Sequence, residues 1–139
     1  MSSVQNMSET TKVITFGTFD LLHVGHVRML RRCAELGTTL TVGVSSDELN
    51  YKKKGRAPIY PLNERLEIIQ SLDCVDNVFV EESLEAKPEY CKGHDVFVIG
   101  DDWKGKFDDL KSKELQVVYL ERTKNISTTE TIDKIMNLI

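Results

Sequence analysis

Five short apolar runs alternate with segments of helical periodicity along this chain, and this alternation restricts its fold more than any other feature. The runs span residues 12–16, 39–44, 75–81, 95–99 and 115–120. Strands that alternate with helices build a parallel sheet, because each parallel crossover needs a connection about the size of a helix. The run at 95–99 is unbroken, as expected for a strand buried on both faces. The sequence therefore predicts an α/β fold with a single-domain, doubly wound, five-stranded parallel sheet.

The segments between the runs carry helix signals at their ends. Apolar side chains recur at helical spacing from residue 23 to residue 36, and Gly37 follows where a glycine commonly ends a helix. Ser127 and Glu130 have the spacing of a capping box, which predicts a last helix after Ser127. Further helical segments are expected over residues 45–48, 61–72 and 83–93, and a basic loop over residues 50–58.

The length of 139 residues fits one domain, which we expect over residues 12–139 after a disordered leader at 1–11. The net charge of −4 argues against nucleic-acid binding by bulk attraction, so an anion site needs local clustering. The three cysteines are widely spaced and lack zinc spacing, which favours reduced thiols in a cytoplasmic protein. No apolar run approaches the length of a membrane span, so no membrane partner is expected.

The stretch from Phe16 to His26 joins the first predicted strand to the first predicted helix. It contains two glycines, an aspartate and two histidines three residues apart, His23 and His26. Backbone N–H groups and the positive end of a helix at such a turn are suited to bind phosphate. The histidines would lie on one face of the helix start. Two other interpretations stay open, a partly exposed pair without function and a metal pair, although metal needs further ligands and His94 lies elsewhere.

Other unusual residues also follow predicted strands. Asp101, Asp102 and Trp103 come after the fourth strand, and the segment 122–129 comes after the fifth. Ligands of open parallel sheets bind at the carboxyl ends of the strands, so these residues are expected to meet the histidines there. Arg122 and the free N–H groups behind Ser127 would form a second anion site. Taken alone, this last segment is equally consistent with a well-capped surface helix.

Three sequence blocks together resemble one enzyme family. FGTFDLLHVGH, at residues 16–26, is similar to the H-x-G-H signature of the cytidylyltransferase-like nucleotidyltransferases. GDDWKGKFDDL and RTKNISTT resemble the glycerol-3-phosphate cytidylyltransferase branch of that family, and the resemblance covers residues 12–137. It implies a Rossmann-like nucleotidyltransferase fold, transfer of CMP from CTP to sn-glycerol 3-phosphate, Mg²⁺ bound with CTP, and a homodimer. No covalent intermediate is implied, because the substrate phosphate is itself the nucleophile.

The resemblance also implies a set of site residues, with no protein side chain as a metal ligand. The catalytic residues would be His23, His26, Lys53 and Arg122. The nucleotide-binding residues would be Gly17, Thr18, Phe19, Asp20, Gly25, Arg65, Asp102, Thr123, Ile126, Ser127 and Thr128, and the substrate-binding residues Lys53 and Trp103. Asp20 would orient a lysine or a metal ion, and Asp102 would accept from ribose hydroxyls. Simpler interpretations remain for several: a solvated basic loop for Lys53, a surface arginine for Arg65, turn-forming aspartates for Asp20 and Asp102, and a half-buried aromatic for Trp103.

Some positions depart from the family pattern and leave the acceptor open. Asp73 stands where relatives carry a basic or bulky residue, Leu84 replaces an aromatic, and Asn125 replaces a glycine. Asn125 should tolerate this, because Asn adopts left-handed backbone more readily than most residues. Residues 55–76 are at least as similar to relatives that transfer AMP to sugar phosphates. The alternatives are therefore phosphocholine or phosphoethanolamine as acceptor, adenylyl transfer to a sugar phosphate, and a non-catalytic nucleotide-binding module.

Overall fold

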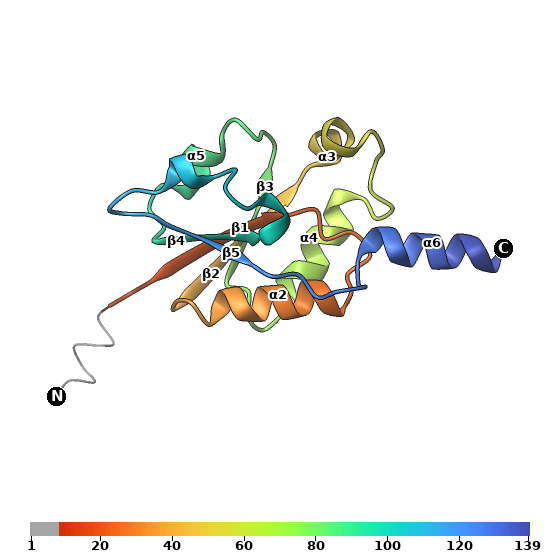
Figure 1. Ribbon diagram of the computed structural model, residues 1–139, viewed down its shortest axis with the longest axis horizontal. Helices are drawn as coiled ribbons and strands as arrows, with labels where there is room; N and C mark the ends of the chain where they lie inside the picture. Colours follow the sequence, from red (N-terminus) through yellow and green to blue (C-terminus); the bar gives the residue numbers. More distant parts are fainter. Residues whose placement is uncertain (1–8) are drawn as a thin grey trace.

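A computed structural model describes residues 9–139 and contains one parallel sheet (Figure 1). Its strands are β1 (Lys12–Gly17), β2 (Thr39–Ser45), β3 (Asn77–Glu81), β4 (Val96–Gly100) and β5 (Gln116–Leu120), in the order β3-β2-β1-β4-β5. The chain adds strands outward from β1 to β3 and then returns to pair β4 with the other side of β1. The switch point, where such sheets bind ligands, therefore lies between β1 and β4. The predicted five-stranded parallel sheet is confirmed.

Helices cover both faces of this sheet. They are α2 (Val24–Ala34), α3 (Asp47–Lys54), α4 (Leu62–Gln70), α5 (Lys87–Cys91) and α6 (Thr128–Leu138), with short 3-10 turns at Asp101–Trp103 and Asp108–Leu110. On one face, Leu30 of α2 and Ile69 of α4 pack against valines of β1, β2 and β4. On the other face, Cys91 of α5 packs with Phe97 of β4, and Phe107 closes that side. This arrangement confirms the doubly wound architecture.

The basic segment after β2 differs from the expected loop. Ser46 caps α3 by accepting a hydrogen bond from the Leu49 N–H at 3.0 Å, and Gly55 ends the helix with a left-handed φ of 74°. These two end signals extend the predicted short turn into a helix that includes all three consecutive lysines. The prediction of a basic loop was therefore wrong for residues 50–54. Lys53 and Lys54 are carried on a helix rather than on a flexible loop.

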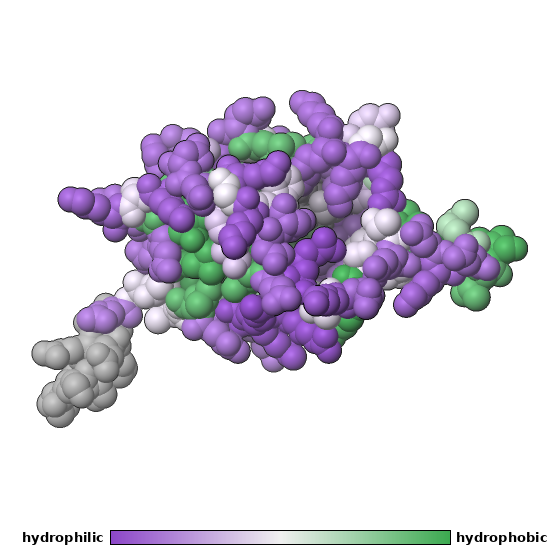
Figure 2. All heavy atoms as spheres, in the orientation of Figure 1, coloured by the Kyte–Doolittle hydropathy of each residue, from purple (hydrophilic) through white to green (hydrophobic). Residues whose placement is uncertain are grey.

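Helix α6 begins at the predicted place. Ser127 is its N-cap and accepts a hydrogen bond from the Glu130 N–H at 3.1 Å. Asn125, just before it, has a φ of 62°, which is the left-handed conformation expected for a residue that replaces a glycine. Figure 1 shows α6 reaching away from the sheet to the carboxyl terminus, and Figure 2 shows apolar atoms gathered at that end.

The disordered leader was predicted over residues 1–11. Residues 1–8 of this segment lie outside the described residues. Thr11 belongs to the predicted leader, yet its carbonyl accepts a hydrogen bond from the Thr38 N–H at 2.8 Å. Thr11 thus contacts the segment that leads into β2, and the predicted boundary at residue 11 stays a prediction. Within residues 9–139, no helix combines the length and apolar character needed to cross a membrane.

Candidate active site

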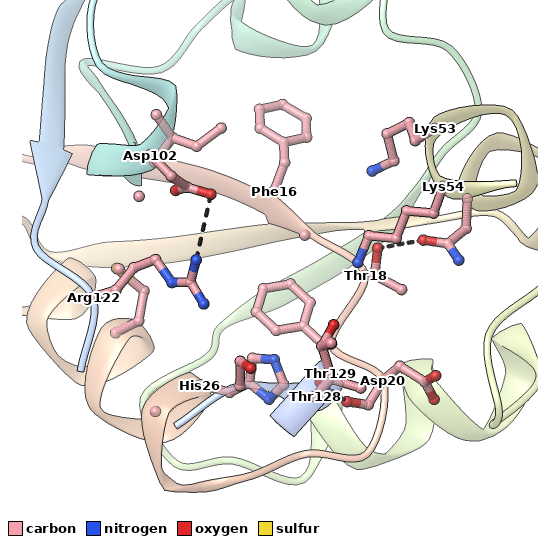
Figure 3. A pocket seen from close by; sticks show the side chains of 18 of the residues that line it. Phe16, Thr18, Asp20, His26, Lys53, Lys54, Asp102, Arg122, Thr128 and Thr129 are labelled. Atoms are coloured by element: carbon pink, nitrogen blue, oxygen red, sulfur yellow. Dashed lines mark hydrogen bonds and ion pairs between the residues drawn. The ribbon is translucent and has the colours of Figure 1, made fainter. Parts of the chain in front are cut away.

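A cavity of about 570 Å³ opens at the carboxyl ends of the strands (Figure 3). Residues from the turn after β1, helices α2 and α3, the end of β4 and the segment after β5 form its walls. The predicted site residues that line it are Gly17, Thr18, Phe19, Asp20, His23, Gly25, His26, Lys53, Asp102, Trp103, Arg122, Thr123, Ile126, Ser127 and Thr128. Among the predicted site residues, only Arg65 is missing from this cavity. The expected convergence of distant motifs at this edge of the sheet is therefore seen.

His23 and His26 form the start of helix α2 itself. His23 is the N-cap, and its Nδ1 accepts a hydrogen bond from the Gly25 N–H at 3.1 Å. In return the His23 N–H donates to Nδ1 of His26 at 3.2 Å, which completes a reciprocal capping box. The two rings stack with centroids 3.7 Å apart. The histidines are thus fixed in position by the backbone that they cap.

This capping determines what the imidazoles present to a ligand. A nitrogen that accepts a hydrogen bond carries no proton, so the neutral ring of each histidine carries its proton on Nε2. Burial lowers the pKa of His23, with a smaller effect of the Arg122 charge. Burial, with smaller effects of His23, Lys54 and Arg122, lowers the pKa of His26 to about 3. Both rings are therefore neutral near pH 7 and offer Nε2–H groups as donors.

The glycine between the histidines leaves space for the ring of His23. A Cβ on Gly25 would lie 3.0 Å from Cε1 and Nδ1 of His23 and 3.4 Å from a methyl carbon of Ile126. Gly25 lines the cavity, so its assignment as a nucleotide-binding residue stays a prediction. Its lack of a side chain makes room for the His23 imidazole against the helix.

The turn between β1 and α2 is strained and tightly held. Phe19 and Leu21 have φ values of 55° and 49°, in the left-handed region that is costly for residues other than glycine. Between them, the buried Asp20 carboxylate accepts the backbone N–H groups of Ile59 at 2.6 Å and Tyr60 at 2.9 Å. The expectation that Asp20 orients a lysine or a metal ion stays a prediction, because Lys54 also lies within reach of the charge of Asp20. Its carboxylate anchors the segment between α3 and α4 to this turn.

Arg65 is the clearest correction among the predicted site residues. Its side chain is fully buried, and Nη1 donates to the carbonyls of Thr18 and Ser45 at 3.0 and 2.8 Å. Nε donates to the Tyr60 carbonyl at 2.9 Å, and Nη2 pairs with Asp47 at 2.6 Å. These partners take four of its five N–H donors, and the buried side chain does not line the cavity, so Arg65 supports the cavity walls instead of contacting the nucleotide.

Helix α3 and the segment after β5 bring positive charge to the cavity. The walls contain five basic side chains, Lys53, Lys54, Arg56, Lys87 and Arg122, against three carboxylates, Asp20, Glu81 and Asp102. Burial is the main cause that lowers the pKa of both Lys53 and Lys54, and neighbouring cations add to it. In a chain of net charge −4, this local excess marks an anion-binding site.

The rim of the cavity lies after β4 and β5. Arg122 Nη1 is 3.7 Å from Asp102 Oδ2, and both side chains are 51% exposed, so each remains accessible to a ligand. Trp103 is 37% exposed and lies beside Phe107, with ring centroids 5.7 Å apart. Thr128, at the start of α6, donates to the Asp20 carbonyl at 2.7 Å and ties this helix to the turn after β1.

The sequence predictions missed several cavity residues. Asn50 is buried, accepts from the Thr18 hydroxyl at 2.7 Å and holds that residue in place. Glu81 and Lys87 form a buried ion pair at 2.7 Å in the cavity wall. The position of Glu81 at the end of a predicted strand was a usable signal, whereas no motif marks Lys87. Of the positions that depart from the family pattern, Leu84 lines the cavity. Asp73 is exposed and does not line it.

The side chains around the cavity can be tested for their fit to a metal ion. The described residues include no group of three or more His, Cys, Asp or Glu side chains arranged to hold a metal ion. Mg²⁺ usually keeps several waters and binds through one or two carboxylates together with substrate phosphates. Asp102, at the open rim, is the carboxylate that fits such a partial contact. The site thus fits Mg²⁺ that enters with a triphosphate.

Comparison with known proteins gives consistent results. A sequence model of the cytidylyltransferase-like family matches residues 14–134. The glycerol-3-phosphate cytidylyltransferase of Bacillus subtilis is 46% identical over 129 residues, which cover 91% of this chain and 98% of that protein. The glycerol-3-phosphate cytidylyltransferase of Staphylococcus aureus is 44% identical over 121 residues, with 86% and 90% covered. The crystal structure of a lipopolysaccharide core biosynthesis protein from Thermoplasma volcanium superposes with a TM-score of 0.73 at 27% identity, covering 84% of this chain and 100% of that one.

Proposed function

The chain belongs to the cytidylyltransferase-like family, and on that premise we propose that it transfers CMP from CTP to sn-glycerol 3-phosphate. The products are CDP-glycerol and pyrophosphate. The observation that carries this proposal is the cavity, in which the residues of three separate motifs surround an excess of positive charge. Adenylyl transfer and other acceptors are not favoured, because the glycerol-3-phosphate cytidylyltransferases, at 44% and 46% identity, are more similar to this chain than FAD synthases that cover as much of it at 32% and 33% identity.

The proposed reaction is a direct in-line displacement. A phosphate oxygen of glycerol 3-phosphate forms a bond to the α-phosphorus of CTP, and the bond from that phosphorus to the bridging oxygen of the β-phosphate breaks. The electron pair leaves with pyrophosphate. None of the three cysteines lines the cavity, which agrees with a reaction that forms no covalent enzyme intermediate.

We assign the binding of charge in this reaction to groups that the fold holds in place. The Nε2–H groups of His23 and His26 donate to the triphosphate and stabilise the negative charge that grows at the transferred phosphorus. Lys53 meets the acceptor phosphate, and Arg122 binds the pyrophosphate end. Since the acceptor phosphate is already anionic, positioning and charge stabilisation suffice and no strong base is needed. When bound with CTP, Mg²⁺ neutralises part of the triphosphate charge.

One assay tests the proposal. The protein is incubated with Mg²⁺ and either CTP or ATP, across glycerol 3-phosphate, phosphocholine, phosphoethanolamine and sugar phosphates, and pyrophosphate is measured. We expect release with CTP and glycerol 3-phosphate above all other pairs. Release with ATP alone contradicts cytidylyl transfer, and no release with any pair leaves only a nucleotide-binding module.

A homodimer and a cytoplasmic location belong to the same proposal. Helix α6 stands off the sheet and exposes Ile135, Met136 and Leu138 at 49%, 62% and 86%, as a helix that packs on a second copy would (Figure 1). Light scattering coupled to gel filtration measures the mass, and a monomer at micromolar concentration contradicts the dimer.

All three cysteines are free thiols, which supports a reducing compartment.

A further inference from the structure

The side chain of Arg32 joins helix α2 to the segment that carries Arg122. Arg32 lies in the last turn of α2, and its Nη1 donates a hydrogen bond to the Glu121 carbonyl oxygen at 2.8 Å. The two residues of this contact are 89 positions apart in the sequence. Arg32 itself does not line the cavity, so the contact joins two parts of the fold and does not belong to the ligand-binding wall.

The segment that Arg32 contacts forms one wall of the cavity. Residues 121–127 connect β5 with α6 and belong to no helix or strand. The members of this segment that line the cavity are Arg122, Thr123, Ile126 and Ser127. The Arg122 side chain is 51% exposed, and the Asp102 carboxylate lies 3.7 Å away. Exposed ion pairs hold a side chain only weakly, so the place of Arg122 depends on what holds its backbone.

The same segment meets α2 a second time, at the start of the helix. A Cβ on Gly25 would lie 3.4 Å from a methyl carbon of Ile126, so the Ile126 side chain lies against the helix there. Gly25 and Arg32 stand in the i and i+7 relation, and such residues share one face of a helix. Figure 1 shows the connection from β5 to α6 beside α2. One face of α2 therefore holds the segment near both of its ends.

The Glu121 carbonyl is directly linked to the backbone of Arg122. It belongs to the planar peptide unit that includes the Arg122 nitrogen, so a donor that holds this oxygen fixes the plane from which Arg122 starts. The guanidinium keeps its charge at all ordinary pH values, which makes the hydrogen bond charge-assisted. The two histidines cap the start of the same helix. Through Arg32, Arg122 is thus placed relative to the helix that carries His23 and His26.

We propose that Arg32 is a positioning residue for the transfer reaction, which sets the place of Arg122 at the pyrophosphate end of the triphosphate through the Glu121 carbonyl. Arg32 touches neither substrate. This inference rests on the proposed cytidylyl transfer and adds to it a residue that acts through Arg122. Since the acceptor phosphate is assigned to Lys53 on α3, binding of the acceptor should not depend on Arg32.

Substitution of Arg32 tests this role by separating the two substrates. Arg32→Met removes the donor and keeps an apolar chain of similar length. We expect KM for CTP to rise and kcat/KM for CTP to fall about 5- to 20-fold, the scale of one hydrogen bond to a charged group. KM for glycerol 3-phosphate should stay within about twofold of the wild-type value. A variant that was merely less stable would show a lower kcat with both KM values unchanged, and that result overturns the proposal.

Two further variants serve as controls. Arg31→Met makes the same change at the neighbouring exposed arginine of α2 and should leave kcat/KM for CTP within about twofold of the wild type. Arg32→Lys keeps a charged donor and should recover kcat/KM to within about threefold. Equal losses in Arg31→Met and Arg32→Met would assign the effect to the charge of the helix and overturn the role of the Glu121 contact.

A double-mutant cycle shows whether Arg32 acts through Arg122. In an Arg122→Met background, the further change Arg32→Met should alter kcat/KM for CTP by less than about twofold, because the group that Arg32 positions is gone. A further loss of about 5- to 20-fold in that background would show that Arg32 acts on another group, which contradicts the proposal.

Binding of inorganic pyrophosphate separates this inference from the proposed function, because it needs no turnover. In calorimetric titrations with Mg²⁺ present, the Kd for pyrophosphate should be about 5- to 20-fold higher for Arg32→Met than for the wild type or Arg31→Met. An unchanged Kd overturns the role of Arg32. If the wild type binds pyrophosphate but releases none from CTP with any acceptor, the proposed transfer fails and the binding series still decides the role of Arg32. A wild type that binds no pyrophosphate overturns both.

Discussion

The backbone N–H of His23 donates to Nδ1 of His26, and the two imidazole rings stack 3.7 Å apart at the start of helix α2. One pair of side chains thus has two tasks. The Nδ1 atoms satisfy N–H groups that a helix start leaves without partners, and the Nε2–H groups remain for a ligand. Substitutions at His26 separate the two tasks.

His26→Gln should keep the cap and lose catalysis. A glutamine at this third helical position can accept from the His23 N–H as capping-box glutamines do, but it lacks the donor at the place of Nε2. We expect turnover to fall about 100- to 1,000-fold, the scale for losing one donor to the transition state. Pyrophosphate release measures this loss, and urea denaturation should show a change within about 1 kcal/mol.

His26→Ala removes the acceptor as well as the donor, so it should show the same loss of turnover and a further loss of stability. If either variant changes turnover by less than about threefold, the histidines serve only as helix caps.

The lowered pKa of His26 predicts a pH dependence of stability. The unfolded value is near 6.5 and the folded value about 3, so between them the unfolded chain binds a proton that the folded chain does not. The contribution of His26 is therefore fully present above pH 6.5 and is lost as the pH falls toward 3. Relative to His26→Gln, the wild-type free energy of unfolding should fall by up to about 1.4 kcal/mol per pH unit.

Urea denaturation from about pH 7.5 to pH 4.5 measures this difference. His94→Gln is the matched control, because His94 does not line the cavity and is not part of the cap of helix α2. A pH slope that is the same in His26→Gln as in the wild type would show that His26 titrates normally.

The local sequence pattern was sufficient to predict the sheet and most of the residues in the cavity wall. The apolar runs and the rule that parallel strands end at one edge placed His26, Asp102 and Arg122 together, although they are far apart in sequence. Arg65 could not be assigned in this way. It precedes buried Ile69 by one helical turn, but its carbonyl partners come from the ends of β1 and β2 and from the segment before α4. Likewise, nothing local to Lys87 indicates that it meets Glu81 across the β3–α5 connection.

Removal of metal should separate activity from folding. With no cluster of three or more metal-ligating side chains in residues 9–139, Mg²⁺ should bind with the triphosphate and not with the free protein. EDTA should abolish pyrophosphate release and leave the Tm of the nucleotide-free protein unchanged within about 1 °C. A Tm that rises on addition of Mg²⁺ alone would reveal a resident site and contradict this account.

Substitution of Arg65 distinguishes support of the cavity from contact with the nucleotide. Arg65→Met removes a fully buried guanidinium and leaves the carbonyls of Thr18, Ser45 and Tyr60 without these donors. Each buried polar group that loses its partner costs about 1–3 kcal/mol, so the free energy of unfolding should fall by about 3 kcal/mol or more. Arg31→Met, on the exposed side of α2, is the control and should change stability by less than about 0.5 kcal/mol. If Arg65 bound the nucleotide directly, Arg65→Met would instead unfold at the wild-type urea concentration and lose only affinity for CTP. Because the guanidinium joins the turn after β1 to the end of β2, we expect the loss of stability.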